Sequence, residues 1–216
     1  MRASDQNLIQ RLSERNADRD RATDGGIHSR KLTPPRKLTP PAAIKILRSV
    51  ELEIGFKLPE LLRTIYLRVG NGGFGPQYGI VGTRGGAKLD GRTLETLYKD
   101  MLKLERENSV WSWPKRLLPL ANYGCGQWSC VDCEYKKLPM IVWAPGNLDA
   151  RLRGDDARLD WGNSFWDQGQ SLRAWLEGWL AEKPEPEPKW PSNPWMRKRL
   201  GFTFPKKVDS GREQSG

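Results

Sequence analysis

The stretch from Leu58 to Gly73 constrains the fold most, because it predicts a short amphipathic helix with both ends marked. Pro59 suits the first helical turn, where a missing N–H group costs nothing. Gly70 is expected to end the helix in the left-handed conformation, and residues 71–73 (Asn-Gly-Gly) then allow a sharp turn. No catalytic side chain accompanies this shape, which favours recognition or packing over chemistry. The helix shows one apolar face at helical spacing, formed by Leu61, Leu62, Ile65, Tyr66 and Val69.

Further helices and strands are predicted on both sides of this stretch. Apolar spacing indicates helices over 43–54, 92–108 and 172–180, and Ser171 is a candidate N-cap for the last one. Between the last two helices lie four short segments that favour β-strands, with 136–138 as a hairpin turn. These four segments are 117–120, 127–133, 140–143 and 164–166.

The two ends of the chain differ from the middle in charge and apolar content. Residues 1–42 and 183–216 each carry a net charge of +4, whereas residues 43–182 carry +2. Residues 1–42 contain only Leu8, Ile9 and Leu12 as an apolar group, which predicts a basic, disordered arm. Alternating prolines over 183–188 mark a boundary, so 183–216 is expected to be a Pro-rich linker and basic tail. The middle, 43–182, is the predicted folded domain.

A duplicated segment, Lys-Leu-Thr-Pro-Pro at 31–35 and 37–41, lies at the end of the first arm. Paired prolines favour an extended spacer, and a docking motif is the alternative. The sequence shows no apolar core of a signal peptide and no run of about 18 apolar residues that could span a membrane. Together with an odd number of cysteines, this predicts a cytoplasmic protein. The basic arms predict at most weak, salt-sensitive, non-specific contact with nucleic acid, because no readout motif is present.

The sequence offers little for catalysis or metal binding. Its one histidine, His28, lies in the predicted arm, which removes most hydrolase arrangements. Cys130 and Cys133 form a C-x-x-C pair on a predicted strand without a second pair, so structural thiols are favoured over a zinc or redox site. Whether these two thiols and Cys125 meet in space stays open. We therefore expect no catalytic residue, no metal and no cofactor.

The order of these features resembles the SUKH superfamily, the SMI/KNR type. The resemblance rests on a first amphipathic helix, Leu58-Pro59 opening a second one, and the Asn-Gly-Gly turn. A strand with Leu118-Pro119-Leu120 follows, then a glycine-rich entry to a strand over 124–133 and a last helix from Ser171. It covers about residues 43–181, and the loop over 145–163 departs from it.

The resemblance implies an α+β fold with helices packed on one side of a curved, mainly antiparallel sheet. Bacterial members are largely immunity proteins that bind and neutralise a toxin, and fungal members are regulators and scaffolds, so no enzyme is expected. The leading prediction is an immunity protein that binds a cognate toxin directly, and the alternative is a scaffold or adaptor that recruits partners through its arms. By resemblance, the recurrent motif positions are candidates for partner binding, or else they shape the fold. These positions are Asn71, Gly72, Gly73, Trp128 and Asp132.

Overall fold

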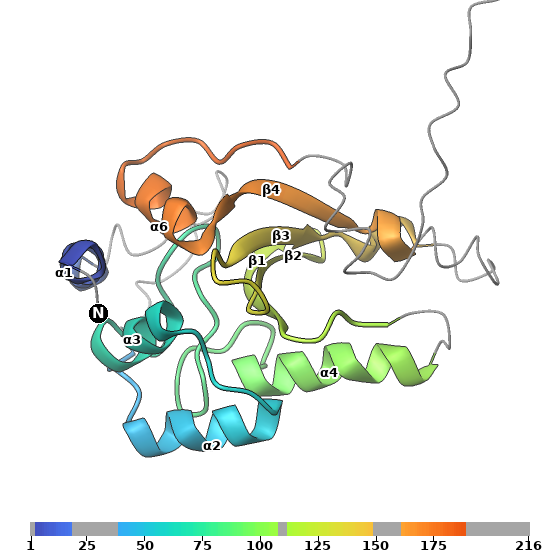
Figure 1. Ribbon diagram of the computed structural model, residues 1–216, viewed down its shortest axis with the longest axis horizontal. Helices are drawn as coiled ribbons and strands as arrows, with labels where there is room; N and C mark the ends of the chain where they lie inside the picture. Colours follow the sequence, from blue (N-terminus) through green and yellow to red (C-terminus); the bar gives the residue numbers. More distant parts are fainter. Residues whose placement is uncertain (1–2, 19–38, 108–111, 149–160, 189–216) are drawn as a thin grey trace, which may run out of the picture.

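The computed structural model describes residues 3–18, 39–107, 112–148 and 161–188. These residues form an α+β fold in which helices accompany an open antiparallel sheet (Figure 1). The helices are α1 (Ala3–Ala17), α2 (Ile44–Ile54), α3 (Glu60–Arg68), α4 (Leu94–Glu107) and α6 (Leu172–Leu180), with a short 3-10 turn, η1, at Pro145–Asn147. The strands are β1 (Leu117–Gly124), β2 (Gln127–Asp132), β3 (Pro139–Trp143) and β4 (Phe165–Ser171).

The sheet is a simple antiparallel meander in the order β1-β2-β3-β4. Register shifts interrupt the β1–β2 and β3–β4 ladders, and such irregularities increase the local twist of a sheet. The helices gather on one side of the sheet: α4 packs on β1, and α6 packs on β3 and β4 (Figure 1). The remaining helices pack on other helices: α2 contacts α4, and α1 contacts both α3 and α6. The predicted fold class is therefore confirmed.

Most predicted elements are present with shifted boundaries. α2 ends at Gly55, which adopts a φ of +84°, and Ser171 caps α6 by accepting a hydrogen bond from Ala174 N at 3.2 Å. The last strand is longer than predicted, because β4 continues to Ser171 along the edge of the sheet. The aromatic side chains at one end of the sheet pack edge to face, with ring centroids 5.1 Å apart for Trp113 and Trp143. Such packing fixes the sheet end more firmly than area burial alone.

The end of α3 differs from the prediction. Gly70 does not adopt a positive φ, and the helix ends at Val69, which remains in the right-handed helical region. Glycine leaves room there for two close neighbours, because a Cβ at position 70 would lie 3.0 Å from Asn16 Nδ2 and 3.0 Å from Thr39 O. The sharp turn itself follows at Gly72 and Gly73, with φ values of +77° and +84°.

The first part of the predicted N-terminal arm is a packed helix, so the prediction of disorder is wrong for Ala3–Ala17. Leu8, Ile9 and Leu12 lie on one face of α1 and are buried in the main core. Three apolar residues suffice here because α1 also makes polar contacts, including an ion pair between Asp5 and Arg173. The rest of that arm up to residue 38, and the tail beyond 188, lie outside the described residues. No helix in the described part is long and apolar enough to cross a membrane.

Candidate protein-binding face

The turn after α3 is closed by the side chain of Asn71, which is only 4% exposed. Its Oδ1 accepts hydrogen bonds from Thr83 N at 2.8 Å and from Thr83 Oγ1 at 2.9 Å. Its Nδ2 donates to the carbonyl oxygens of Thr83 and Arg84, each at 3.3 Å. The single amide group of Asn71 thus supplies both an acceptor and a donor to the polar groups of residues 83–84, which an aliphatic side chain could not do.

Glycines allow the two loops to approach at this point. A Cβ on Gly72 would lie 2.4 Å from Gly82 N, and one on Gly86 would lie 2.3 Å from Asn71 Cγ. The second Lys-Leu-Thr-Pro-Pro copy also contributes: Thr39 Oγ1 donates to Gly72 O at 2.5 Å, and Asn71 N donates to Pro40 O at 3.0 Å. We call this set of contacts the Asn71 latch. It joins the chain before α2, the turn after α3 and the glycine-rich loop before α4.

The other two motif residues lie on β2 and are also buried. Trp128 is 4% exposed, and the Arg92 guanidinium lies 5.9 Å from the centroid of its ring. Asp132 is 1% exposed, and its Oδ1 accepts a hydrogen bond from Glu134 N at 3.0 Å, where β2 turns toward β3. The five motif positions thus fall into two groups on different elements. The side chains of Asn71, Trp128 and Asp132 are buried. Partner binding at these positions stays a prediction, and it would involve mainly the exposed residues around them.

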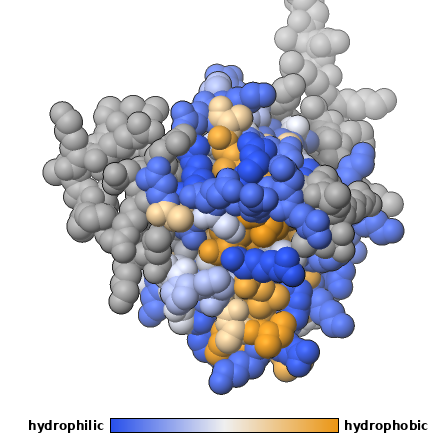
Figure 2. All heavy atoms as spheres, turned by 90° about the vertical axis from the view of Figure 1, so that its left-hand side faces the viewer, coloured by the Kyte–Doolittle hydropathy of each residue, from blue (hydrophilic) through white to orange (hydrophobic). Residues whose placement is uncertain are grey.

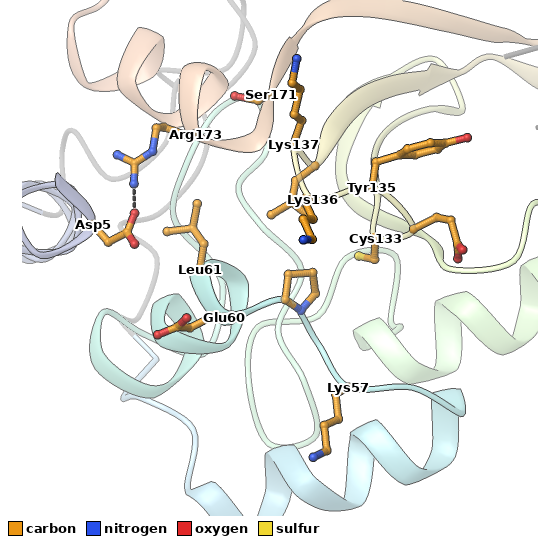
Figure 3. Close-up of a pocket in the computed structure, with 13 residues that line it drawn as sticks. Asp5, Lys57, Glu60, Leu61, Cys133, Tyr135, Lys136, Lys137, Ser171 and Arg173 are labelled. Atoms are coloured by element: carbon orange, nitrogen blue, oxygen red, sulfur yellow. Dashed lines mark hydrogen bonds and ion pairs between the residues drawn. The ribbon is translucent and has the colours of Figure 1, made fainter. Parts of the chain in front are cut away.

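One such surface is the groove beside the β2–β3 turn, with a volume of about 900 Å³. It lies between the start of α3, the turn over 133–138 and the start of α6 (Figure 3). Lys57, Lys136 and Lys137 are exposed at its rim and form no ion pair with a described residue. Arg173 differs, because it pairs with both Asp5 and Glu177. Glu60 and Glu134 also line the groove, and Glu134 pairs with Arg116, so the cationic side chains of the lining outnumber the acidic ones by four to three.

A second groove of about 710 Å³ adjoins the first, and Lys57 lines both. Its apolar feature is Leu52 on α2, the most exposed large apolar side chain of the described residues at 84%. The acidic residue in this groove is already neutralised: Glu51 pairs with Arg63 at 2.5 Å and accepts a hydrogen bond from Leu58 N at 3.1 Å. We call the joint surface of Leu52, Lys57, Lys136 and Lys137 the lysine-rich face.

Apolar surface is also visible on the side of the molecule where α1, α2 and α3 lie, in patches crossed by hydrophilic side chains (Figure 2). Ile44, at the start of α2, is 44% exposed. Isolated exposed apolar residues are normal on monomers, so an exposed leucine matters mainly when polar recognition groups surround it. Leu52 fulfils this condition because the cationic side chains of Arg48, Lys57 and Arg63 line the same groove.

Comparison with known families now decides the affiliation. The model of the SMI1 / KNR4 family (SUKH-1) matches residues 41–167, more than half of the chain. The chain belongs to the SMI1/KNR4 (SUKH-1) family. Searches of curated proteins and of solved structures gave no significant match. The family match contains the lysine-rich face and the Asn71 latch except for Thr39 and Pro40, whereas α1 and α6 lie outside it.

The sequence did not single out the lysine-rich face, although it held two signals. Lys136 and Lys137 are expected in a hairpin turn, and two adjacent lysines there also concentrate positive charge at one point of the surface. Leu52 is an apolar residue on the polar side of α2, away from the face that buries Leu47, Val50 and Ile54. An apolar residue out of phase with its helix is a detectable sign of an exposed contact residue.

The cysteines fit the structural interpretation. Cys130 is buried in β2 and Cys133 is half-buried just after it, and all three cysteines are free thiols. Burial raises the pKa of both the Cys130 and the Cys133 thiol, so neither is a ready nucleophile. Their Sγ atoms lie 3.7 Å from Trp128 O and 3.8 Å from Val131 O. Within the described residues, no group of three or more His, Cys, Asp or Glu side chains is placed to hold a metal ion.

Proposed function

We propose that this chain is a non-catalytic, immunity-type protein that neutralises a cognate toxin by binding it through the lysine-rich face. The observation that carries the proposal is that Lys57, Lys136 and Lys137 form no ion pair with a described residue and line a groove whose neighbour contains a leucine that is 84% exposed. Family membership supports a binding domain of this kind. The buried, protonated thiols and the paired carboxylates of the grooves also fit binding better than catalysis.

The chemistry of the face indicates an acidic partner. Leu52 can fill an apolar pocket on the partner, while Lys57, Lys136 and Lys137 attract carboxylates around it. An apolar centre with a charged rim is the usual arrangement of protein interfaces. Such a rim mainly accelerates association and confers specificity, and its contribution falls with ionic strength.

Co-expression tests the proposal directly. Each toxin encoded near the gene of this chain is expressed in cells with and without the chain. We expect the chain to restore survival only in the cells that express its cognate toxin. Lys136→Glu/Lys137→Glu should abolish rescue and weaken binding at least about tenfold, because two attractions become repulsions. Lys45→Glu/Lys88→Glu is the matched control, since both lysines are exposed away from the grooves and the net charge changes equally. Failure to rescue from any candidate toxin, or equal binding by both double variants, would contradict the proposal.

The scaffold alternative makes a different prediction about the chain ends. The net charge of +4 at each end favours it, because such segments suit loose recruitment of acidic partners. Deletions that test it should remove only 19–38 or 189–216, since Ala3–Ala17 belong to the fold. Loss of partner capture with an intact core would favour the scaffold, and capture that nuclease abolishes would indicate nucleic acid instead.

A further inference from the structure

A polar socket on the sheet holds a carboxylate from the chain's own Pro-rich segment. Glu185 accepts hydrogen bonds from Gln77 Nε2, at 3.2 Å to Oε1 and 3.0 Å to Oε2. Its Oε1 also accepts from Trp175 Nε1 at 3.3 Å. Gln77 Nε2 lies 2.9 Å from Ser129 Oγ, which Gln168 Nε2 approaches at 3.2 Å. Two uncharged donors, Gln77 and Trp175, thus bind one anionic group, and Ser129 on β2 connects Gln77 to Gln168 on β4 behind them.

The socket is preorganised by the fold. Ser129 and Gln168 are buried on β2 and β4, and Trp175 is buried on α6. Gln77 holds a left-handed backbone with a φ of +59°, an uncommon conformation for a residue with a side chain. Hydrogen-bond donors that the fold already holds in place are expected of a binding site, because little conformational entropy is lost when the ligand binds.

The socket also has capacity that Glu185 does not use. Gln168 is about 1% exposed, and its Oε1 has no hydrogen-bond partner among the described residues. Turning the amide over would only exchange which of its two ends lacks a partner. Pro184 and Pro186 flank Glu185 and have no backbone N–H to offer. The chain's own segment therefore leaves one buried acceptor beside the socket without a partner among the described residues.

The Pro-rich segment is held mainly by this one carboxylate. After α6 it runs back along the sheet (Figure 1), and its residues other than Glu185 and Pro188 are exposed. No backbone hydrogen bond joins residues 184–188 to another described residue. A segment fastened by a single side chain can leave without unfolding anything else.

We propose that the socket of Gln77, Ser129, Gln168 and Trp175 is a binding site for an acidic peptide segment of a partner, occupied in cis by Glu185. The Pro-rich segment is then an intramolecular competitor that covers the site until a better segment displaces it. The site is separate from the lysine-rich face and does not depend on the proposed function. It recognises a carboxylate by neutral N–H donors, whereas the lysines of the other face act by charge.

The Trp175 indole N–H gives a direct readout, because it donates to the carboxylate. In ¹⁵N–¹H spectra of the full chain, assigned with Trp175→Phe, Glu185→Ala/Glu187→Ala should shift this signal. Glu187→Ala alone is the matched control and should not, since Glu187 is exposed. The probe is acetyl-Lys-Pro-Glu-Pro-Glu-Pro-amide, with both glutamates replaced by glutamine in the control peptide. Because a short tether gives an effective concentration in the millimolar range, the probe is titrated to about 10 mM.

The expected result is that the glutamate peptide returns the Trp175 signal of the double variant toward the wild-type position, at least about tenfold more effectively than the glutamine peptide. The wild-type signal is already at that position and should not move in the same titration, and adding Gln77→Ala to the double variant should remove the response. No response of the double variant at about 10 mM, or equal effects of the two peptides, would overturn the site. A variant whose structure is altered would be detected in the same spectra, because many other amide signals would then move.

Discussion

The Asn71 latch allows a strong test of how the chain shapes its surface, by comparison of Asn71→Ala with Asn71→Asp. Alanine removes the acceptor of Thr83 N and Thr83 Oγ1, at 2.8 and 2.9 Å, and two longer bonds to carbonyl oxygens. A buried polar group left without a partner costs about 1–3 kcal/mol. Since Thr83 is fully buried, we expect Asn71→Ala to lower the free energy of unfolding by about 3 kcal/mol.

Aspartate keeps the shape and the acceptor but replaces the Nδ2 donor by a second oxygen. That oxygen would face the carbonyl oxygens of Thr83 and Arg84. At pH 7 this adds repulsion and a desolvated charge, so we expect Asn71→Asp to cost about 2 kcal/mol more than Asn71→Ala. The same environment raises the pKa of the introduced carboxyl in the folded state. Its penalty should therefore shrink as the pH falls through that raised value, because the protonated acid can donate to a carbonyl.

Urea unfolding at pH 7 and pH 4 checks both expectations. With a slope of about 2 kcal/mol per molar urea, a loss of 3 kcal/mol moves the midpoint by about 1.5 M. The reasoning is refuted if Asn71→Ala stays within about 0.5 kcal/mol of wild type, or if Asn71→Asp is no worse than Asn71→Ala at pH 7. A variant that keeps its stability but loses partner binding would instead support direct recognition by Asn71.

Three further predictions concern the core, the surface charges and the thiols. Leu12→Ala should lower stability by about 2–5 kcal/mol in thermal or urea unfolding, because Leu12 is fully buried, whereas an exposed disordered arm would show no effect. The Lys99 and Arg84 side chains hold the pKa of Glu53 below its ordinary value of 4.5, so its stabilisation is present above that ordinary value and fades as the pH falls through the lower pKa of the folded state. Glu53→Gln should remove this pH dependence and cost less than about 1 kcal/mol, because the pair is exposed, and an unchanged acid titration of stability would count against it. In the native protein, Ellman's reagent should modify exposed Cys125 at least tenfold faster than buried Cys130, and equal rates would contradict the assigned burial.

The sequence predicted the elements that depend on local patterns. The apolar spacing of α2 and α6, and the N-cap at Ser171, are properties of neighbouring residues, and these features are confirmed. The same local rule misled at Gly70, where glycine serves the approach of Asn16 and Thr39 from distant parts of the chain. Leu8 and Leu12 give too weak a pattern for a stable isolated helix, and α1 forms because α3 and α6 bury its face.

The candidate surfaces were harder to predict for the same reason. Lys57 and Lys137 come together only through the β2–β3 hairpin and the start of α3, which are about 80 residues apart in the sequence. Glu185 was read as part of a boundary, and the alternating prolines gave no sign that its carboxylate would find Gln77 and Trp175. Motif resemblance identified residues that hold loops together, because fold-forming positions and contact positions look alike in a single sequence.

The contact between α1 and α6 has a consequence for the order in which the chain acquires its structure during synthesis. Arg15 lies over the ring of Trp179 at 4.4 Å and donates to Leu180 O at 3.5 Å, and Asp5 pairs with Arg173. The ribosome makes α1 first but makes these partners some 165 residues later. The contacts between α1 and α6 therefore cannot form until almost the whole domain has left the exit tunnel. Its docking closes the fold, and an interrupted chain would leave Leu8 and Leu12 open to chaperones and proteases.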